Sequence, residues 1–233
     1  MNFAALRYEE LSLNAFPSIH TEVCDGWILR FREGGDWRDS CVLPLYLSTR
    51  SYEDKIDFCE KKFAARSLPC AFKMTPNVPA ALDQQLEQRG YVIMGKTRVL
   101  ECRAGSLPAL PRQDGKNPMP EPDCCRRGNK GNKIEAFLRK NGTVIAGGIG
   151  IFEEDTMGLY DIHVSPGYRR QGLGTAICRT LMEAGFQAGV KSVHLQVLAS
   201  SVEALSLYRS LGFQEIYLYW YRVRMAFSSV SAS

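Results

Sequence analysis

Short runs of apolar residues, separated by polar turns, predict helices and strands along the whole chain. Apolar residues at helical spacing, such as Ile56, Cys59 and Phe63, predict a helix with one buried face. Alternating runs such as SVHLQVL predict half-buried strands. The predicted helices cover residues 4–14, 52–66, 79–90, 173–184 and 200–213. The predicted strands cover residues 26–31, 40–47, 70–74, 91–100, 133–140, 143–152, 158–164, 192–198 and 214–225.

Local signals mark where several of these elements begin and end. Asn141-Gly142 between two strand-like runs predicts a tight hairpin. Ser200 and Glu203 have the spacing of a capping box, which predicts a helix start. Residues 103–123 are rich in proline and glycine and therefore predict a linker or a long loop.

A layout of helix, Gly-aromatic pair and strand occurs twice, around Gly90 and around Gly212, which indicates two related modules. We therefore expect an N-terminal module, a linker, a second module and a short tail. Their expected bounds are residues 1–103, 104–130, 131–227 and 228–233.

Composition places the chain among ordinary globular proteins. It has 233 residues, 45% hydrophobic residues and a formal net charge of +4, an excess too slight to argue for nucleic acid. None of the eight cysteines forms a C-x-x-C pair, which argues against a zinc site, and we expect no metal. The first residues lack the pattern of a signal peptide, and no apolar run reaches the roughly 20 residues of a membrane span. We therefore expect a reduced, cytoplasmic protein without a membrane partner.

The most informative stretch is VSPGYRRQGLG, residues 164–174, which lies between a predicted strand and a predicted helix. Glycines ahead of a helix let backbone N–H groups converge on one point, and the helix N-terminus adds partial positive charge. Arg169 and Arg170 add full charges, so this turn suits a diphosphate. It is not a P-loop, because no lysine follows the glycines, and it is not a Rossmann fingerprint, because the third glycine position is Ile177.

The stretch YDIHVSPGYRRQGLGTAI resembles the acyl-CoA-binding signature of the GCN5-related N-acetyltransferase (GNAT) superfamily, [RQ]-x-x-G-x-[GA], with Arg169, Gly172 and Gly174 in its fixed places. ALSLYRSLGFQE, with Tyr208, resembles the second signature of that family. The N-terminal half is similar to the degenerate first module of some two-module members. The resemblance implies an α/β fold of two GNAT-like modules, each a twisted, mixed, largely antiparallel sheet flanked by helices.

The resemblance also implies acetyl-CoA as donor and an unidentified amine as acceptor. It implies that the strand before the loop pairs with the pantetheine arm, that amides of the loop hold the diphosphate, and that the thioester enters between two splayed parallel strands. The implied cofactor-binding residues are Ile162, His163, Val164, Arg169, Arg170, Gln171, Gly172, Leu173, Gly174, Thr175, Ser201 and Tyr208.

The expected reaction is direct attack of a primary amine, of a small molecule or a peptide, on the thioester in a ternary complex. Tyr208 matches the usual acid of the family. A general base is harder to assign, because the strand position where some members carry Glu is Gln196. Asp161, His163 and a water relay are the open alternatives. Simple alternation puts Asp161 and His163 on the same side of the strand, unless a bulge interrupts it.

Two other functions stay open at this point. The missing Glu allows a non-catalytic module that senses acyl-CoA. The degenerate first half could instead serve as a scaffold or a dimer surface, so the chain is expected to be either a monomer or a homodimer.

Overall fold

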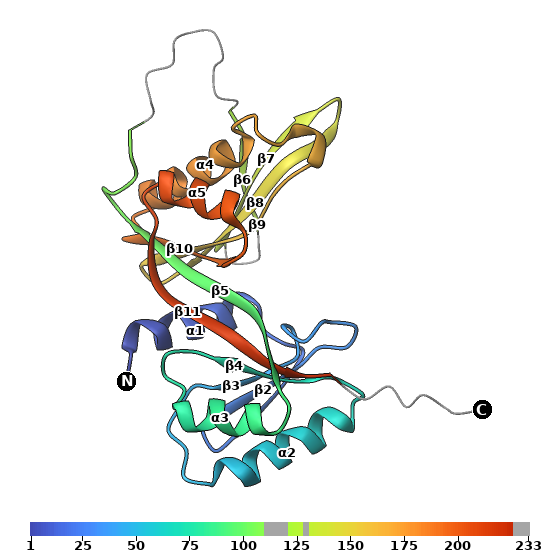
Figure 1. The fold of residues 1–233 in the computed structure, drawn as a ribbon. Coiled ribbons are helices and arrows are strands. Elements are labelled where there is room, and N and C mark those ends of the chain that lie inside the picture. The colour runs from blue at the N-terminus through green and yellow to red at the C-terminus, as the bar shows by residue number, and fades with distance from the viewer. Residues whose placement is uncertain (110–120, 128–130, 226–233) are drawn as a thin grey trace, which may run out of the picture. The chain divides into compact units, whose positions relative to one another are not determined.

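The computed structural model describes residues 1–109, 121–127 and 131–225 (Figure 1). Contacts divide the chain into two compact units. The first unit consists of Met1–Thr97 together with the chain from Tyr217 onward, and the second consists of Arg98–Ile216. The division falls within two strands, β5 (Val92–Arg103) and β11 (Gln214–Arg224), so each of these strands contributes to both units. The expected boundaries follow the chain instead, with one module after the other.

The first unit is a mixed sheet with helices. Its strands are β1 (His20–Cys24), β2 (Trp27–Phe31), β3 (Val42–Pro44), β4 (Cys70–Met74) and the end of β11, in the order β1-β2-β3-β4-β11. Its helices are α1 (Phe3–Ala15), α2 (Tyr52–Ala64) and α3 (Ala80–Gln88). Only the β3–β4 pair is parallel among the strand pairs that the structure defines in this unit.

The apolar face of α2 anchors the core of the first unit. Ile56, Cys59 and Phe63 are fully buried, as their helical spacing predicts, and they pack with aromatic residues such as Trp27 and Phe72. Full burial of a large apolar side chain contributes roughly 1.5–3 kcal/mol. This face therefore accounts for much of the attachment of α2 to the sheet.

The interior of this unit contains a buried ion pair between Glu9 and Lys73. The Glu9 carboxylate is 1% exposed and lies 2.6 Å from Nζ of Lys73. The Tyr217 hydroxyl donates to the same carboxylate at 2.8 Å, and Lys73 lies 3.9 Å from the ring centroid of Tyr219. Buried charges are tolerated only when they are paired and hydrogen-bonded, and this group meets both conditions.

The second unit contains the longer strands. They are β6 (Asp123–Arg127), β7 (Lys133–Lys140), β8 (Thr143–Glu153), β9 (Thr156–Val164) and β10 (Ser192–Leu198), in the order β5-β10-β9-β8-β7-β6. Its helices are α4 (Leu173–Gln187) and α5 (Val202–Ser210), and a 3₁₀ turn covers Pro166–Tyr168. Strands β6 to β9 pair antiparallel, whereas β9 and β10 pair parallel. The mixed α/β fold predicted from the sequence is confirmed.

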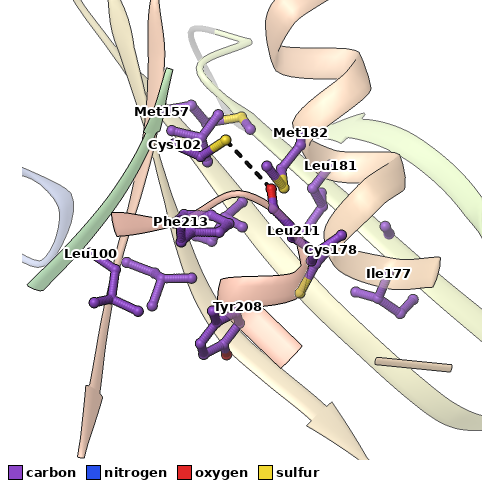
Figure 2. Close-up of a cluster of buried hydrophobic side chains, with 14 of the residues drawn as sticks. Leu100, Cys102, Met157, Ile177, Cys178, Leu181, Met182, Tyr208, Leu211 and Phe213 are labelled. Carbon is purple, nitrogen blue, oxygen red and sulfur yellow. Dashed lines mark hydrogen bonds between the residues drawn. The ribbon is translucent and has the colours of Figure 1, made fainter. Parts of the chain in front are cut away.

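Helices α4 and α5 close the core of the second unit. Figure 2 shows Ile177, Cys178 and Leu181 of α4 beside Tyr208 of α5, all pointing into one apolar cluster. The thiol of Cys102 in β5 donates to the carbonyl of Leu211 in the same cluster, at 3.5 Å. These contacts hold the middle of α4 and the C-terminal end of α5 in one core.

The Asn-Gly hairpin is confirmed. Lys140 pairs with Thr143, so Asn141 and Gly142 form a two-residue turn between β7 and β8. Both turn residues have positive φ, 50° and 78°, as a type I′ turn requires.

Three local predictions were wrong. Strand β1 was not predicted, and neither was β6, which lies inside the expected linker. The expected capping box does not form, because Ser201 rather than Ser200 is the N-cap of α5, and it makes no side-chain cap bond. Residues 110–120, 128–130 and 226–233, which include most of the expected linker and tail, lie outside the described residues.

Candidate active site

A β-bulge in β9 decides which way the candidate residues point. Gly147 of β8 pairs with His163, but Ile149 pairs with Tyr160, so β9 has one residue more than β8 in this interval. Asp161 has φ of 52°, a left-handed conformation that is uncommon outside glycine. An extra residue reverses the alternation of side chains that follow it.

The positions of Ile162 and His163 follow from this reversal. A Cβ placed on Gly148 would lie 2.4 Å from Cδ1 of Ile162 and 3.0 Å from Ile177, so Ile162 faces α4. A Cβ placed on Gly147 would lie 3.0 Å from the ring of His163, so His163 lies on the opposite face. The bulge therefore turns an apolar side chain toward the core and leaves the imidazole half exposed.

Asp161 and His163 lie close together on the surface of the second unit. Oδ1 of Asp161 is 4.0 Å from Nδ1 of His163, and their side chains are 72% and 50% exposed. Nδ1 also lies 2.9 Å from the carbonyl oxygen of Asp161. A carbonyl can only accept, so Nδ1 donates, and Nε2 of the neutral ring is left as an acceptor. The two side chains therefore lie together at the bulge.

The parallel register of β9 and β10 ends beside this bulge. Their parallel pairing runs from Ser192 opposite Thr156 to Leu195 opposite Leu159. Both strands continue further, β9 to Val164 and β10 to Leu198. The parallel register therefore ends before either strand does.

The loop after β9 leaves the N-terminus of α4 open. Gly172 is the N-cap, with φ of 78°, and Arg170 also has positive φ, 63°. The first helical hydrogen bond runs from the amide of Ala176 to the carbonyl of Gly172, at 3.0 Å. Within the described chain, the amides of residues 171–175 donate to no backbone carbonyl, and no acidic residue stands in the first turn. Free amide donors at the positive end of a helix are chemically suited to an anion.

Cations surround this loop. Arg169 and Arg170 are both exposed, and Nε of Arg169 donates to the carbonyl of Val164 at 3.4 Å. Nζ of Lys140 lies 5.2 Å from the ring centroid of Tyr168 in the same loop. Sequence reasoning missed Lys140, because only the β7–β8 hairpin brings it to this loop and no local motif marks it.

Tyr208 lies in the core rather than at the surface. Its side chain is 8% exposed and packs edge-on against Phe213, with ring centroids 5.8 Å apart. Burial raises the pKa of the Tyr208 phenol above its ordinary value, and neighbouring Cys178 acts in the same direction (Figure 2). The phenol is therefore protonated at neutral pH and can donate a hydrogen bond.

The remaining candidates are placed as follows. Leu173 is buried in the core, whereas Gly174 and Thr175 are half-buried in the first turn of α4. A Cβ on Gly174 would lie 3.1 Å from Leu207 of α5, so a larger residue would press on that helix. Ser201 is half-buried at the N-cap of α5, and Gln196 is half-buried in β10.

Comparison with known proteins locates a family domain in the second unit. Residues 103–213 match the model of the acetyltransferase (GNAT) family. The chain is 40% identical over 88 residues to the [ribosomal protein bS18]-alanine N-acetyltransferase of Escherichia coli strain K12. This match covers 37% of the chain and 60% of that enzyme's length.

Solved structures resemble the whole chain. A GCN5-related N-acetyltransferase from Kribbella flavida matches with a TM-score of 0.68 at 14% identity, over 94% of this chain and 95% of the other. A tandem GNAT protein from the clavulanic acid biosynthesis pathway matches with a TM-score of 0.58 at 11% identity, over 94% and 92%. At this identity the likeness concerns the fold. Among the described residues, no helix has the length and hydropathy to cross a membrane.

Proposed function

Because the chain belongs to the GCN5-related N-acetyltransferase (GNAT) superfamily of acyltransferases and has two modules of that fold, we propose that its second unit transfers an acetyl group from acetyl-CoA to a primary amine. The observation that carries this proposal is the open N-terminus of α4. Within the described chain, the five consecutive amides of residues 171–175 donate to no backbone carbonyl, and the first turn contains no acid. This arrangement fits the diphosphate of CoA, which brings two negative charges and several acceptor oxygens.

The splayed strand ends fit the rest of the donor. The pantetheine arm contains two amides, which can pair with backbone groups of β9 from Ile162 to Val164 in the manner of an added strand. The thioester then lies where β9 and β10 part. A backbone N–H of β9, such as that of Val164, serves as the donor to the oxyanion that develops on the thioester carbonyl.

The chemical step forms one bond and breaks one. The neutral amine attacks the carbonyl carbon, a C–N bond forms, and the C–S bond breaks to release the CoA thiolate. Tyr208 donates a hydrogen bond to that thiolate, because burial keeps its phenol protonated. The proton lost by the amine goes to Nε2 of His163, whose ring is oriented by the bond from Nδ1 to the carbonyl of Asp161, or to a water held beside it.

The acceptor is proposed to be an amine of a small molecule or a peptide. The E. coli relative is named for an alanine of a ribosomal protein, which makes a peptide N-terminus a natural first candidate. Asp161, with a side chain 72% exposed at the mouth of the splay, can attract a cationic amine before it loses its proton.

Calorimetry and an acetylation panel test the proposal. We expect acetyl-CoA to bind, and we expect free thiol release with at least one amine in a panel of peptides and small amines. Replacing both Arg169 and Arg170 by Ala should weaken acetyl-CoA binding by about tenfold, since each exposed charge pair contributes up to about 1 kcal/mol. The same variant should bind acetyl-pantetheine, which lacks the diphosphate, as the wild type does.

Lys191→Ala is the matched control, because Lys191 is an exposed cation of the same unit, 80% exposed and paired with Asp155. Absence of acetyl-CoA binding by the wild type would refute the proposal. Binding without turnover on the whole panel would favour the non-catalytic sensor instead.

A further inference from the structure

The two units repeat the same order of elements around their parallel strands. In the second unit, β9 leads through a loop to α4, then to β10 and α5. In the first unit, β3 leads through a loop to α2, then to β4 and α3. The strands on either side of the first helix pair parallel in both cases, Val42 opposite Phe72 and Leu159 opposite Leu195. The loop before α2 is thus the counterpart of the loop before α4.

A side chain already fills the loop before α2. The carboxylate of Asp25 accepts from the amide of Thr49 at 3.0 Å and from the amide of Arg50 at 2.9 Å. It also accepts from the hydroxyls of Ser48, at 2.8 Å, and Thr49, at 3.0 Å. The Arg50 amide, the Ser48 hydroxyl and the Thr49 amide, in that order, hold the pKa of Asp25 far below its usual range.

A buried cation completes this arrangement. The side chain of Lys55 is 0% exposed, and its Nζ lies 3.4 Å from Oδ2 of Asp25. Nζ donates to the carbonyl oxygen of Asp25 and to the hydroxyl of Ser48, both at 2.5 Å, and lies 3.9 Å from the ring centroid of Trp27. Amides, hydroxyls and an ammonium group thus converge on one carboxylate, as they would on a bound oxyanion.

The first turn of α2 is also capped and negatively charged, whereas that of α4 is neither. Oγ of Ser51 caps α2 by accepting from the amide of Asp54 at 3.2 Å, and Glu53 and Asp54 place two acids in the first turn. Helix α4 has no side-chain cap and no acid there. The first unit therefore satisfies this helix end internally, and the added negative charge repels a second anion.

We propose that Asp25 occupies in the first unit the place that the second unit leaves open for a diphosphate. The first unit then contains an oxyanion cradle of Thr49, Arg50, Ser48 and Lys55 that the chain fills with its own carboxylate. Small carboxylates and phosphate are the ligands that this cradle takes when Asp25 is removed. In the wild type it takes none, and the first unit does not bind CoA.

The hairpin geometry makes Asp25 removable without backbone strain. Asp25 and Gly26 form the two-residue turn between Cys24 and Trp27, with φ of 43° and 80°. A type I′ turn accepts Gly-Gly, so Asp25→Gly deletes the carboxylate and keeps the turn. Asp25→Asn keeps the volume of the side chain but presents an NH₂ group to a site of donors.

Thermal unfolding with added anions tests the cradle without reference to CoA. Trp27, Trp37 and Trp220 are the three tryptophans of the chain and all belong to the first unit, so their fluorescence reports its melting. We expect Asp25→Gly to melt about 10 °C lower than the wild type, because Lys55 loses its buried counter-charge. Sodium formate or phosphate should restore at least about 4 °C, compared with sodium chloride at equal ionic strength.

Two variants serve as controls. Asp25→Asn should be destabilised but not restored by formate, because its side chain still occupies the cradle. Glu154→Gly removes an acid with φ of 52° from the two-residue turn between Glu153 and Thr156, and it should show no anion-specific gain. The proposal is overturned if Asp25→Gly melts like the wild type, or if formate and phosphate restore no more than chloride does.

Hydrogen exchange of the wild type gives a second test that needs no folded variant. The amides of Thr49 and Arg50 should exchange slowly because Asp25 holds them, whereas those of residues 171–175 should exchange rapidly in the absence of CoA. Rapid exchange at Thr49 and Arg50 would also overturn the proposal. Failure of the second unit to bind CoA would leave both tests unaffected.

Discussion

The substitution Tyr208→Phe separates the proposed chemistry from binding. The ring of Tyr208 is 8% exposed and packs edge-on against Phe213, 5.8 Å away between centroids. Phenylalanine keeps the ring and this contact, so the variant removes the hydroxyl and little else. We therefore expect the fold and the Kd for acetyl-CoA to be those of the wild type.

The magnitude follows from the hydrogen bond that is lost. A bond to a charged group contributes about 1.5–3 kcal/mol net, and the CoA thiolate carries full charge only as the C–S bond breaks. An interaction made only in the transition state appears in kcat. We therefore expect kcat to fall by roughly 10- to 150-fold at an unchanged Kd.

The pH profile gives the same prediction an independent readout. Burial raises the pKa of Tyr208, so the wild-type phenol keeps its proton as the pH rises past the ordinary value of about 10. No loss of kcat from phenol ionisation is expected between pH 7 and 9.5. Toward low pH, kcat should fall instead, because the base that receives the amine proton is then already protonated.

The initial rate of CoA thiol release at saturating amine and acetyl-CoA measures kcat, and calorimetry measures the Kd for acetyl-CoA. Tyr46→Phe is the control, because Tyr46 is an exposed tyrosine of the first unit whose hydroxyl donates to Glu10 at 2.7 Å. An unchanged kcat for Tyr208→Phe would refute the role of the hydroxyl. A raised Kd together with an unchanged kcat would assign Tyr208 to binding alone.

Three further outcomes follow from the structure. Calorimetry should give one CoA per chain, and a second site of any affinity would contradict the filled cradle in the first unit. Glu9→Gln should lower the free energy of unfolding of the first unit by about 3–5 kcal/mol, because it leaves Lys73 as a buried unpaired charge. Urea unfolding followed by tryptophan fluorescence measures this loss of stability, and a loss under about 1 kcal/mol would contradict the prediction. Gly148→Ala should destabilise the second unit by about 1–3 kcal/mol, since its Cβ would lie 2.4 Å from Ile162. Gly167→Ala should be neutral in the same circular dichroism melt, because a Cβ there meets nothing within 4 Å.

Most elements could be predicted because their hydrophobic pattern reflects burial. Residues 192–198 and 70–74 form strands with the predicted bounds, and both are mainly buried. Strand β1 escaped prediction because its residues are mostly exposed, with Val23 73% exposed. An exposed strand of this kind has little hydrophobic alternation, so its signal is weak. Strand β6 was not predicted because it has only five residues and follows a segment rich in proline and glycine, which indicated a linker.

The candidate site could be predicted only where the chemistry is local. The glycines and arginines of the proposed anion loop all lie within residues 164–174, so the sequence is sufficient to propose it. The bulge at Asp161 has no such signal, because Asp161 adopts φ of 52° without being glycine. The approach of Lys140 to Tyr168 depends on a hairpin and a loop that are far apart in sequence. Tertiary pairing, not residue type, decides both features.

The contrast between the two units shows why an open helix end is informative. Both loops precede a helix that follows one strand of a parallel pair, and both helix ends therefore attract anions. The sequence shows that the loop before α2 lacks glycine. It does not show which acid accepts hydrogen bonds from the amides of that loop, because Asp25 lies 24 residues before Thr49. A helix end that the chain satisfies with its own carboxylate serves stability. A helix end such as that of α4, where the amides of residues 171–175 donate to no backbone carbonyl of the described chain, costs stability until a ligand binds, which is the expected cost of a functional site.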